Sequence, residues 1–226
     1  MRRPVVKKEI VDFMRTRQKQ VSGSLKELET FAHAENIPII PHETVAYFRF
    51  LLETLQPEKV LEIGTAIGFS ALLMAEHAPQ AQITTIDRNP EMIALAKANF
   101  AKFDKRKQIT LLEGDAMDIL PSLKDCYDFV FMDSAKSKYI VFLPRILELL
   151  EVGGVVVLDD IFQGGDVAKD IMEVRRGQRT IYRGLQNLFN ATLNHPDLTA
   201  SLVPLGDGIL MIRKNAETVT LPDPSS

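Results

Sequence analysis

The feature that most constrains this chain is a glycine turn that directly follows a short apolar strand. Residues 60–70 read VLEIGTAIGFS, so an apolar segment ends at Glu62, and Gly64 and Gly68 then open a helix. At such turns the backbone of an α/β protein approaches a nucleotide-like ligand, and a side chain would block that approach. The G-x-x-x-G spacing differs from the dinucleotide pattern G-x-G-x-x-G, which disfavours a pyrophosphate ligand.

An acidic residue follows at the distance expected for a ribose-binding group. Asp87 ends the next apolar segment, AQITTID, where α/β proteins place the acceptor for ribose hydroxyls. Together, Glu62, Gly64, Gly68 and Asp87 resemble the S-adenosylmethionine (SAM) site of class I methyltransferases. The alternative is a generic Rossmann-like turn whose glycines serve the fold alone.

Composition narrows the class of protein. The chain has 226 residues, 46% hydrophobic residues and a net charge of −3, so it fits one domain with an extension and is no general polyelectrolyte. Its single cysteine, Cys126, excludes an intrachain disulfide, as suits a reducing compartment. No apolar run reaches the roughly 18 residues of a membrane span, and no apolar segment follows the basic start MRRPVVKKEI. We therefore expect a cytoplasmic protein without membrane contact.

The pattern of the chain changes near residue 57. Residues 1–56 have helical periodicity, interrupted at IPIIP (residues 37–41), where two prolines exclude a helix interior. From Lys59 onward, short apolar strands alternate with amphipathic helices, which predicts a parallel sheet covered on both faces. We expect an N-terminal helical extension (1–56), one methyltransferase-like domain (57–216) and a polar tail (217–226). The expected strands are 59–63, 82–87, 108–113, 127–133 and 154–160, with helices beginning near Ser70, Pro90, Ala116 and Tyr139.

The last part of the chain has a different pattern. A polar segment predicts a long helix over about 166–195, and SLVPLGDGILMIRK (residues 201–214) predicts two strands around a Gly206-Asp207-Gly208 turn. This hairpin would add antiparallel strands to the parallel sheet.

Acidic residues also follow the third, fourth and fifth strands, where doubly wound sheets bind ligands. Asp115 could accept from an adenine amino group and the Ala116 N–H could donate to a ring nitrogen, although Asp115 could equally cap a helix.

Asp133, Asp159 and Asp160 should converge, and three converging carboxylates favour a hard divalent cation such as Mg²⁺. Solvated loop acids are the alternative. Lys136 could accept a substrate proton, or it could be a surface lysine at a helix start.

These motifs resemble the metal-dependent O-methyltransferase family that includes the catechol and caffeoyl-CoA O-methyltransferases. The resemblance covers nearly the whole chain, from the IPII segment to the GDG turn. It implies a Rossmann-like class I methyltransferase fold with strand order 3-2-1-4-5-7-6, a homodimer, and SAM and Mg²⁺ (or another divalent cation) as cofactors. It assigns Asp133 and Lys136 to the catalytic centre and Asp133 also to the cofactor site. It places Ile40 near the SAM methionine moiety and implies that Ser70 binds the SAM carboxylate. Asp160 departs from the family's usual Asp-Asn motif.

Within the family, ENIPII, TAIGFS and PLGDG are similar to the bacterial branch that methylates 5-hydroxyuridine at the tRNA wobble position. The C5 hydroxyl and C4 carbonyl of that base are adjacent oxygens, as in a catechol. Two basic sets could contact phosphates, and they could equally be solvated helix faces. The first, expected on one helix, is Arg175, Arg176, Arg179 and Arg183; the second is Arg2, Arg3, Lys7, Lys8, Arg15, Arg17 and Lys19.

Two aromatic residues, Tyr139 and Phe162, are candidates for stacking on a flipped base. The competing functions are methylation of a small catechol-like phenol and a non-catalytic module that binds SAM or RNA. The acidic residues with Lys136 argue against the non-catalytic module, because binding alone requires no such group.

Overall fold

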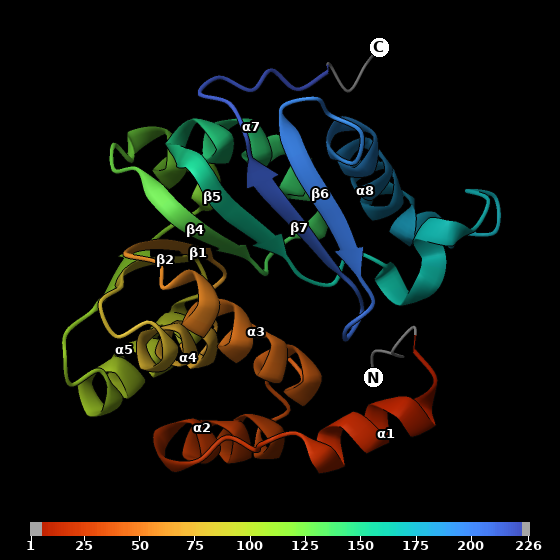
Figure 1. The fold of residues 1–226 in the computed structure, drawn as a ribbon. Coiled ribbons are helices and arrows are strands. Elements are labelled where there is room, and N and C mark those ends of the chain that lie inside the picture. Colours follow the sequence, from red (N-terminus) through yellow and green to blue (C-terminus); the bar gives the residue numbers. More distant parts are fainter. Residues whose placement is uncertain (1–5, 223–226) are drawn as a thin grey trace. The chain divides into compact units, whose positions relative to one another are not determined.

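The computed structural model describes residues 6–222 and contains one seven-stranded sheet (Figure 1). The strand order is β3-β2-β1-β4-β5-β7-β6, which confirms the expected order and the Rossmann-like methyltransferase fold. By compactness the chain forms two units, Lys8–Ile119 and the part from Leu120 onward, which are described separately below. The predicted domain boundaries at 56 and 216 stay predictions.

The first unit begins with three helices. They are α1 (Lys8–Arg17), α2 (Gly23–Ala34) and α3 (His42–Leu55). The IPIIP segment is not helical, and Pro41 caps the start of α3 in an extended conformation, because proline has no N–H for a helix interior. The helical periodicity of this region therefore predicts the observed elements.

The strands and helices after residue 58 also follow the expected alternation. The elements are β1 (Lys59–Ile63), α4 (Phe69–His77), β2 (Gln82–Asp87), α5 (Pro90–Phe103), β3 (Ile109–Glu113) and α6 (Ala116–Ile119). The three strands pair in parallel. Helix α5 starts where the sequence predicts, because the Asn89 side chain accepts from the Glu91 N–H at 3.0 Å and Pro90 occupies the first helical position.

The second unit holds the other four strands. Its elements are η1 (Leu120–Ser122), β4 (Tyr127–Met132), η2 (Lys136–Lys138), α7 (Tyr139–Leu149), β5 (Leu150–Leu158), η3 (Gln163–Ala168), η4 (Arg176–Gln178), α8 (Arg179–Thr192), β6 (Leu198–Val203) and β7 (Ile209–Lys214). Strand β4 pairs in parallel with β5, whereas β7 pairs antiparallel with β5 and with β6. The predicted terminal hairpin is confirmed.

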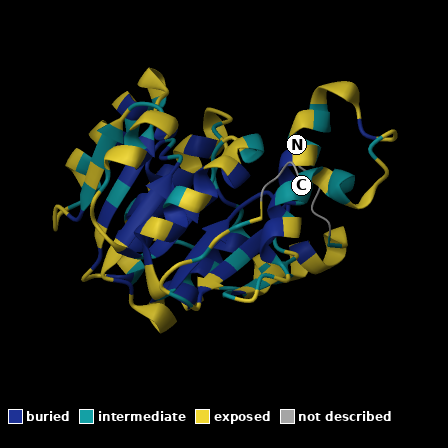
Figure 2. Cartoon of the chain, turned by 90° about the horizontal axis from the view of Figure 1, so that it is seen from above, coloured by how far each residue is buried: buried dark blue, intermediate teal, exposed yellow. Residues whose placement is uncertain are grey.

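The central strands are buried on both faces. Residues 129–132 of β4 and 154–158 of β5 are almost continuously buried, and neighbouring residues of a strand point to opposite faces. In Figure 2 the strands are mainly dark blue, whereas the helices alternate between dark blue and yellow. Burial on both faces explains why these strands read as apolar runs and not as alternating patterns.

The long helix predicted over about 166–195 is confirmed for Arg179–Thr192, and its first part is wrong. Helix α8 begins only at Arg179, and the preceding residues form short 3-10 turns. Within the predicted range Lys169 and Arg175 have ψ values of 164° and 137°, conformations that a helix cannot contain. The polar composition of this segment suits a loop as well as a helix face, so the pattern could not separate the two.

No helix within residues 6–222 combines the length and apolar character that crossing a bilayer requires.

A buried lysine joins the end of β7 to the end of α7. The Lys214 side chain is 3% exposed, and its ammonium donates to the Leu147 carbonyl at 2.8 Å and to the Leu150 carbonyl at 2.7 Å. The last carbonyls of a helix lack intrahelical hydrogen-bond donors and carry partial negative charge. A buried ammonium at this end supplies the missing donors and a favourable positive charge.

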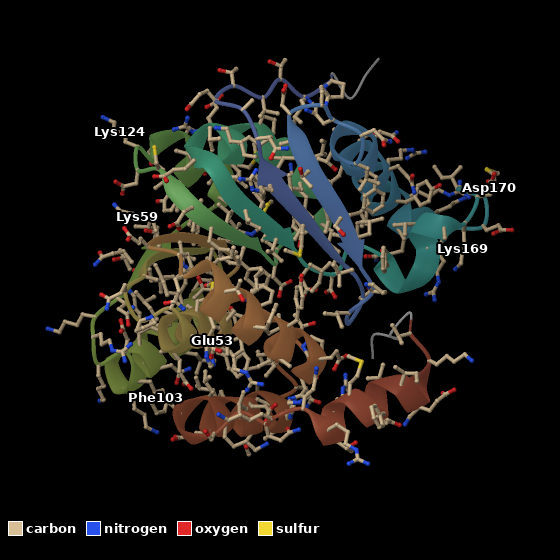
Figure 3. All side chains as sticks on the ribbon, in the orientation of Figure 1. Glu53, Lys59, Phe103, Lys124, Lys169 and Asp170 are labelled. Carbon is tan, nitrogen blue, oxygen red and sulfur yellow. The ribbon has the colours of Figure 1, made fainter. Side chains whose placement is uncertain are left out.

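Replacing Lys214 with methionine should lower the free energy of unfolding by about 2 kcal/mol or more, because two buried carbonyls lose a charged donor. Urea denaturation measures the change. Lys124→Met is the matched control, since Lys124 is exposed and belongs to the same unit (Figure 3). Equal stability of Lys214→Met and the parent would show that the buried ammonium contributes nothing net.

Candidate cofactor and metal sites

The predicted glycine turn connects the end of β1 to the start of α4. The Gly64 N–H donates to the Ile86 carbonyl at 2.9 Å, and Gly64 and Gly68 have φ values of 106° and 83°, a region that favours glycine. A Cβ on Gly68 would also overlap the ring of Phe100 from α5. Helix packing is therefore one reason for Gly68, and contact with a ligand stays a predicted second reason.

Glu62 lies at the centre of a buried hydrogen-bond network. Its side chain is fully buried, and its carboxylate accepts from the hydroxyls of Ser70 and, at 2.5 Å, of Thr85. The Thr65 and Thr85 hydroxyls are 2.6 Å apart. While the Ser70 hydroxyl donates to Glu62, it cannot donate to a cofactor carboxylate. The predicted role of Ser70 therefore requires this hydroxyl to rotate.

Asp87 holds the backbone of the glycine turn. One carboxylate oxygen accepts from the Ala66 N–H at 2.8 Å and the other from the Asn89 N–H at 2.9 Å. Ala66 has a positive φ of 46°, so this hydrogen bond supports an uncommon conformation. A carboxylate oxygen has more than one lone pair, which leaves acceptor capacity for the ribose hydroxyls of the prediction.

Asp115 follows β3 and serves as a helix cap. Its carboxylate accepts from the Met117 N–H at 2.9 Å and forms an ion pair of 2.6 Å with Arg88, a contact that sequence reasoning missed. The capping alternative is therefore present, and the adenine role of Asp115 and Ala116 stays a prediction. Ala116 and Ile40 are 8% and 4% exposed.

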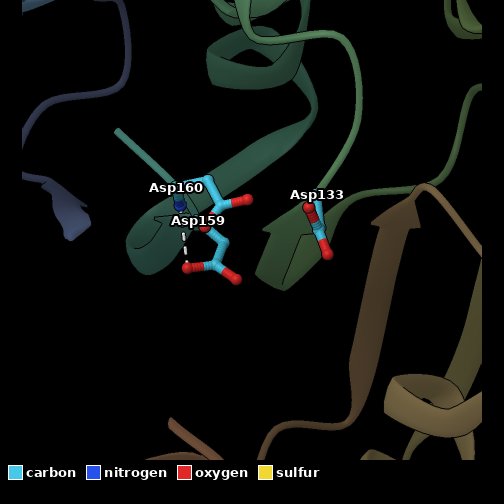
Figure 4. A group of neighbouring side chains, drawn as sticks. All are labelled: Asp133, Asp159 and Asp160. Carbon is cyan, nitrogen blue, oxygen red and sulfur yellow. Dashed lines mark hydrogen bonds between the residues drawn. The ribbon is translucent and has the colours of Figure 1, made fainter. Parts of the chain in front are cut away.

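The three predicted metal-binding aspartates lie together at the ends of β4 and β5 (Figure 4). In the pairing of these strands Met132 is opposite Leu158, so Asp133 and Asp159 leave the sheet side by side. One carboxylate oxygen from each of Asp133, Asp159 and Asp160 lies within 4.8 Å of the others, and Asp159 and Asp160 are 1% and 2% exposed. Such a set of carboxylate oxygens fits a hard divalent cation.

Lys136 contributes a positive charge to this cluster. Its ammonium nitrogen lies 3.1 Å from the Oδ2 of Asp160, and its side chain is 14% exposed. Asp160 has a φ of 57°, a left-handed conformation that asparagine and aspartate adopt more readily than other side chains do. The backbone thus suits either the family's asparagine or the aspartate of this chain, and Lys136 balances the added charge.

The predicted arginine series does not lie on one helix face. Arg175 and Arg176 precede α8, and only Arg179 and Arg183 belong to it. The Arg179 guanidinium donates to the carbonyls of Val174 at 3.0 Å and Met172 at 3.2 Å, so it holds the loop that Lys169 and Asp170 mark in Figure 3. Arg175, Arg176 and Arg183 are exposed.

The N-terminal basic set is partly engaged within the protein, and its Arg2 and Arg3 lie outside the described residues. Arg15 binds the buried Glu43 through hydrogen bonds of 2.7 and 3.0 Å, and this partner raises the pKa of the Arg15 guanidinium. Arg17 lies over the Phe13 ring, 5.6 Å from its centroid.

Neither Tyr139 nor Phe162, the two candidates for stacking on a base, has a fully exposed ring. Tyr139 is fully buried in this structure, so its predicted stacking on a base is wrong. Phe162 is half-buried, and a Cβ on Gly208 of the β6–β7 turn would overlap its ring. The stacking role of Phe162 stays a prediction.

Comparison with known proteins agrees with the fold and the motifs. The family model for O-methyltransferases matches residues 16–215. A caffeoyl-CoA O-methyltransferase of Stellaria longipes is 28% identical over 202 residues, which cover 85% of this chain and 84% of that protein. The O-methyltransferase ankF of Aspergillus thermomutatus is 32% identical over 181 residues, covering 75% and 76% of the two chains.

A solved structure has the same fold. The SAH-bound methyltransferase PaMTH1 of Podospora anserina superposes with a TM-score of 0.82 at 23% identity, over 92% of this chain and 94% of that one. The matched family model and the sequence relatives agree on one class of activity. The chain therefore belongs to the O-methyltransferase family, and its activity is SAM-dependent O-methylation.

Proposed function

We propose that this protein is a metal-dependent O-methyltransferase whose acceptor presents a hydroxyl beside a second oxygen. The observation that carries the proposal is the convergence of Asp133, Asp159 and Asp160, with carboxylate oxygens within 4.8 Å of one another. Three buried or half-buried carboxylates repel one another, and a divalent cation would remove that repulsion. The resemblance to the catechol-type family supports the same reading.

The residues divide into a cofactor site and a reaction site. The methionine and ribose parts of SAM would be bound by Glu62, Gly64, Gly68 and Asp87. Ile40 and Ser70 would lie beside the methionine, and Asp115 and Ala116 at the adenine. Asp133, Asp159 and Asp160 would hold the Mg²⁺, which when bound would acidify the acceptor hydroxyl. Lys136, which pairs with Asp160 at 3.1 Å as the ammonium, would accept the hydroxyl proton only as the neutral amine, a form that a bound metal ion and the SAM sulfonium would favour.

As acceptor we propose 5-hydroxyuridine at the tRNA wobble position, where the product is 5-methoxyuridine. The chain as a whole is acidic, with a net charge of −3, so phosphate binding requires a local group of basic side chains. The exposed Arg175, Arg176 and Arg183 form such a group and support a polyanionic substrate. The hydroxyl and carbonyl of this base are adjacent, as the metal site requires.

A small phenol with adjacent oxygens is the second candidate acceptor. The name of the Stellaria longipes relative, a caffeoyl-CoA O-methyltransferase, favours it. Under either acceptor we propose that the protein acts in the cytoplasm as a homodimer.

Removing divalent cations should abolish methyl transfer, and added Mg²⁺ or Mn²⁺ should restore it, because the metal activates the acceptor hydroxyl. Asp133→Ala should lose activity and bind Mn²⁺ at least about tenfold more weakly, as measured by calorimetry. Asp125→Ala is the control, since Asp125 is exposed and precedes the amino end of β4. Full activity of the chelator-treated parent would refute the metal site.

Asp87→Ala should weaken SAM binding by about 1–3 kcal/mol, the cost of leaving hydroxyl partners without an acceptor. Calorimetry with SAM measures it. Asp104→Ala is a matched control because the Asp104 carboxylate also accepts from two backbone N–H groups, those of Gln108 and Ile109, at 3.0 Å each. Asp104 precedes the amino end of β3, whereas Asp87 is at the carboxyl end of β2, where the cofactor is expected. If both variants lose the same affinity, Asp87 acts through the backbone and not through the ribose.

Changing Arg175, Arg176 and Arg183 together to glutamate should sharply reduce methylation of hydroxyuridine-containing tRNA and lower the salt slope of tRNA binding by roughly one unit per lost contact. Activity on a small catechol should remain, because the aspartates and Lys136 are unchanged. The exposed Lys105 and Lys107, changed to glutamate, provide the control. Unchanged tRNA methylation in the arginine variant would show that these arginines contact only solvent. A parent protein that methylates catechol but not tRNA would favour a small phenol as the acceptor.

A further inference from the structure

One buried hydroxyl contacts both segments that carry the candidate metal ligands. Tyr139, the first residue of α7, is fully buried. Its hydroxyl lies 3.2 Å from the Met132 carbonyl and 3.2 Å from the Asp159 carbonyl, and it accepts from the Ser134 N–H at 3.3 Å. The contacted groups therefore belong to the residues on either side of Asp133 and to Asp159 itself.

This contact lies where the regular sheet ends. The last backbone hydrogen bond between the two segments joins the Asp159 N–H to the Met132 carbonyl at 3.0 Å. Beyond it the ladder cannot continue, because Asp160 adopts a left-handed conformation with φ of 57°. The backbone that presents the carboxylates is thus held by the sheet on one side and by the Tyr139 hydroxyl on the other.

We propose that Tyr139 is a positioning residue of the metal site, which sets the separation of Asp133 from Asp159 through their backbone. The inference rests on the proposed metal-dependent function and adds to it a residue that touches no substrate. Removing a group that orients a metal ligand without binding the metal itself commonly lowers metal affinity by about 10- to 100-fold. The hydroxyl is the acting group, because the ring alone could fill the same buried volume without linking the strands.

The comparison of two tyrosine-to-phenylalanine variants isolates this hydroxyl. Tyr139→Phe removes it at the carboxyl end of β4, and Tyr127→Phe removes a hydroxyl from a tyrosine that is 1% exposed at the amino end of the same strand. Both changes keep the aromatic ring. The loss of a buried hydroxyl's volume is therefore shared by the two variants, whereas the hydrogen bonds to the backbone beside Asp133 and Asp159 are lost in Tyr139→Phe.

Two measurements are made on each full-length protein. Calorimetric titration with Mn²⁺ should show affinity reduced by about 10- to 100-fold in Tyr139→Phe and unchanged in Tyr127→Phe. Hydrogen exchange of the metal-free proteins, followed on peptides covering residues 133–138, should be about tenfold faster in Tyr139→Phe alone, because the Ser134 N–H loses its acceptor. A merely structural role would lower stability without this selective loss of Mn²⁺ affinity.

The outcomes separate the inference from the proposed function. Equal Mn²⁺ affinity in Tyr139→Phe and the parent would overturn the inference and leave the metal site intact. A parent that binds no Mn²⁺ would overturn the proposed metal dependence, and unchanged exchange would then also remove the role of Tyr139 in holding the backbone. Should Tyr139→Phe not fold, an unprotected Ser134 amide in the metal-free parent would contradict the inference, and a protected one would support it.

Discussion

Because β4 and β5 pair in parallel with Met132 opposite Leu158, the two segments leave the sheet at the same level and carry Asp133 and Asp159 out together. Everything proposed for the reaction site depends on this register. A shift of one strand by one residue would turn its carboxylate to the other face of the sheet and separate it from its partner, since side chains alternate along a strand. The apolar residues of both strands, buried on both faces, fix the register, and the Tyr139 hydroxyl extends the connection beyond the last backbone hydrogen bond.

The electrostatic demand of this arrangement explains its chemistry. Burial removes the water that would otherwise stabilise Asp159 and Asp160, and Asp133 adds a third carboxylate within 4.8 Å. Lys136, 3.1 Å from Asp160, supplies one positive charge to the cluster. Three carboxylates this close together repel one another, so the site is suited to a divalent cation. In the proposed mechanism the same lysine, as the neutral amine, would accept the proton of the acceptor hydroxyl.

Local patterns predicted most of the fold, and tertiary contacts account for what they missed. The strands and the glycine turn follow from apolar runs and from Gly64, which are local signals. The segment before α8 was mispredicted because a polar loop and a polar helix face look alike. The sequence predicts an RNA contact for Arg179, but its contacts with the Met172 and Val174 carbonyls depend on a loop path that composition does not reveal. The convergence of the aspartates was predictable from topology, whereas the contacts of Tyr139 were not.

The central claim is that the three aspartates bind a divalent cation in a SAM-dependent enzyme. Anomalous diffraction from crystals grown with Mn²⁺ and SAM tests this claim most directly. The account predicts one strong peak about 2.1 Å from oxygens of Asp133, Asp159 and Asp160, a distance typical of small divalent cations. SAM bound beside Glu62 and Asp87, with no metal peak at the aspartates, would contradict it.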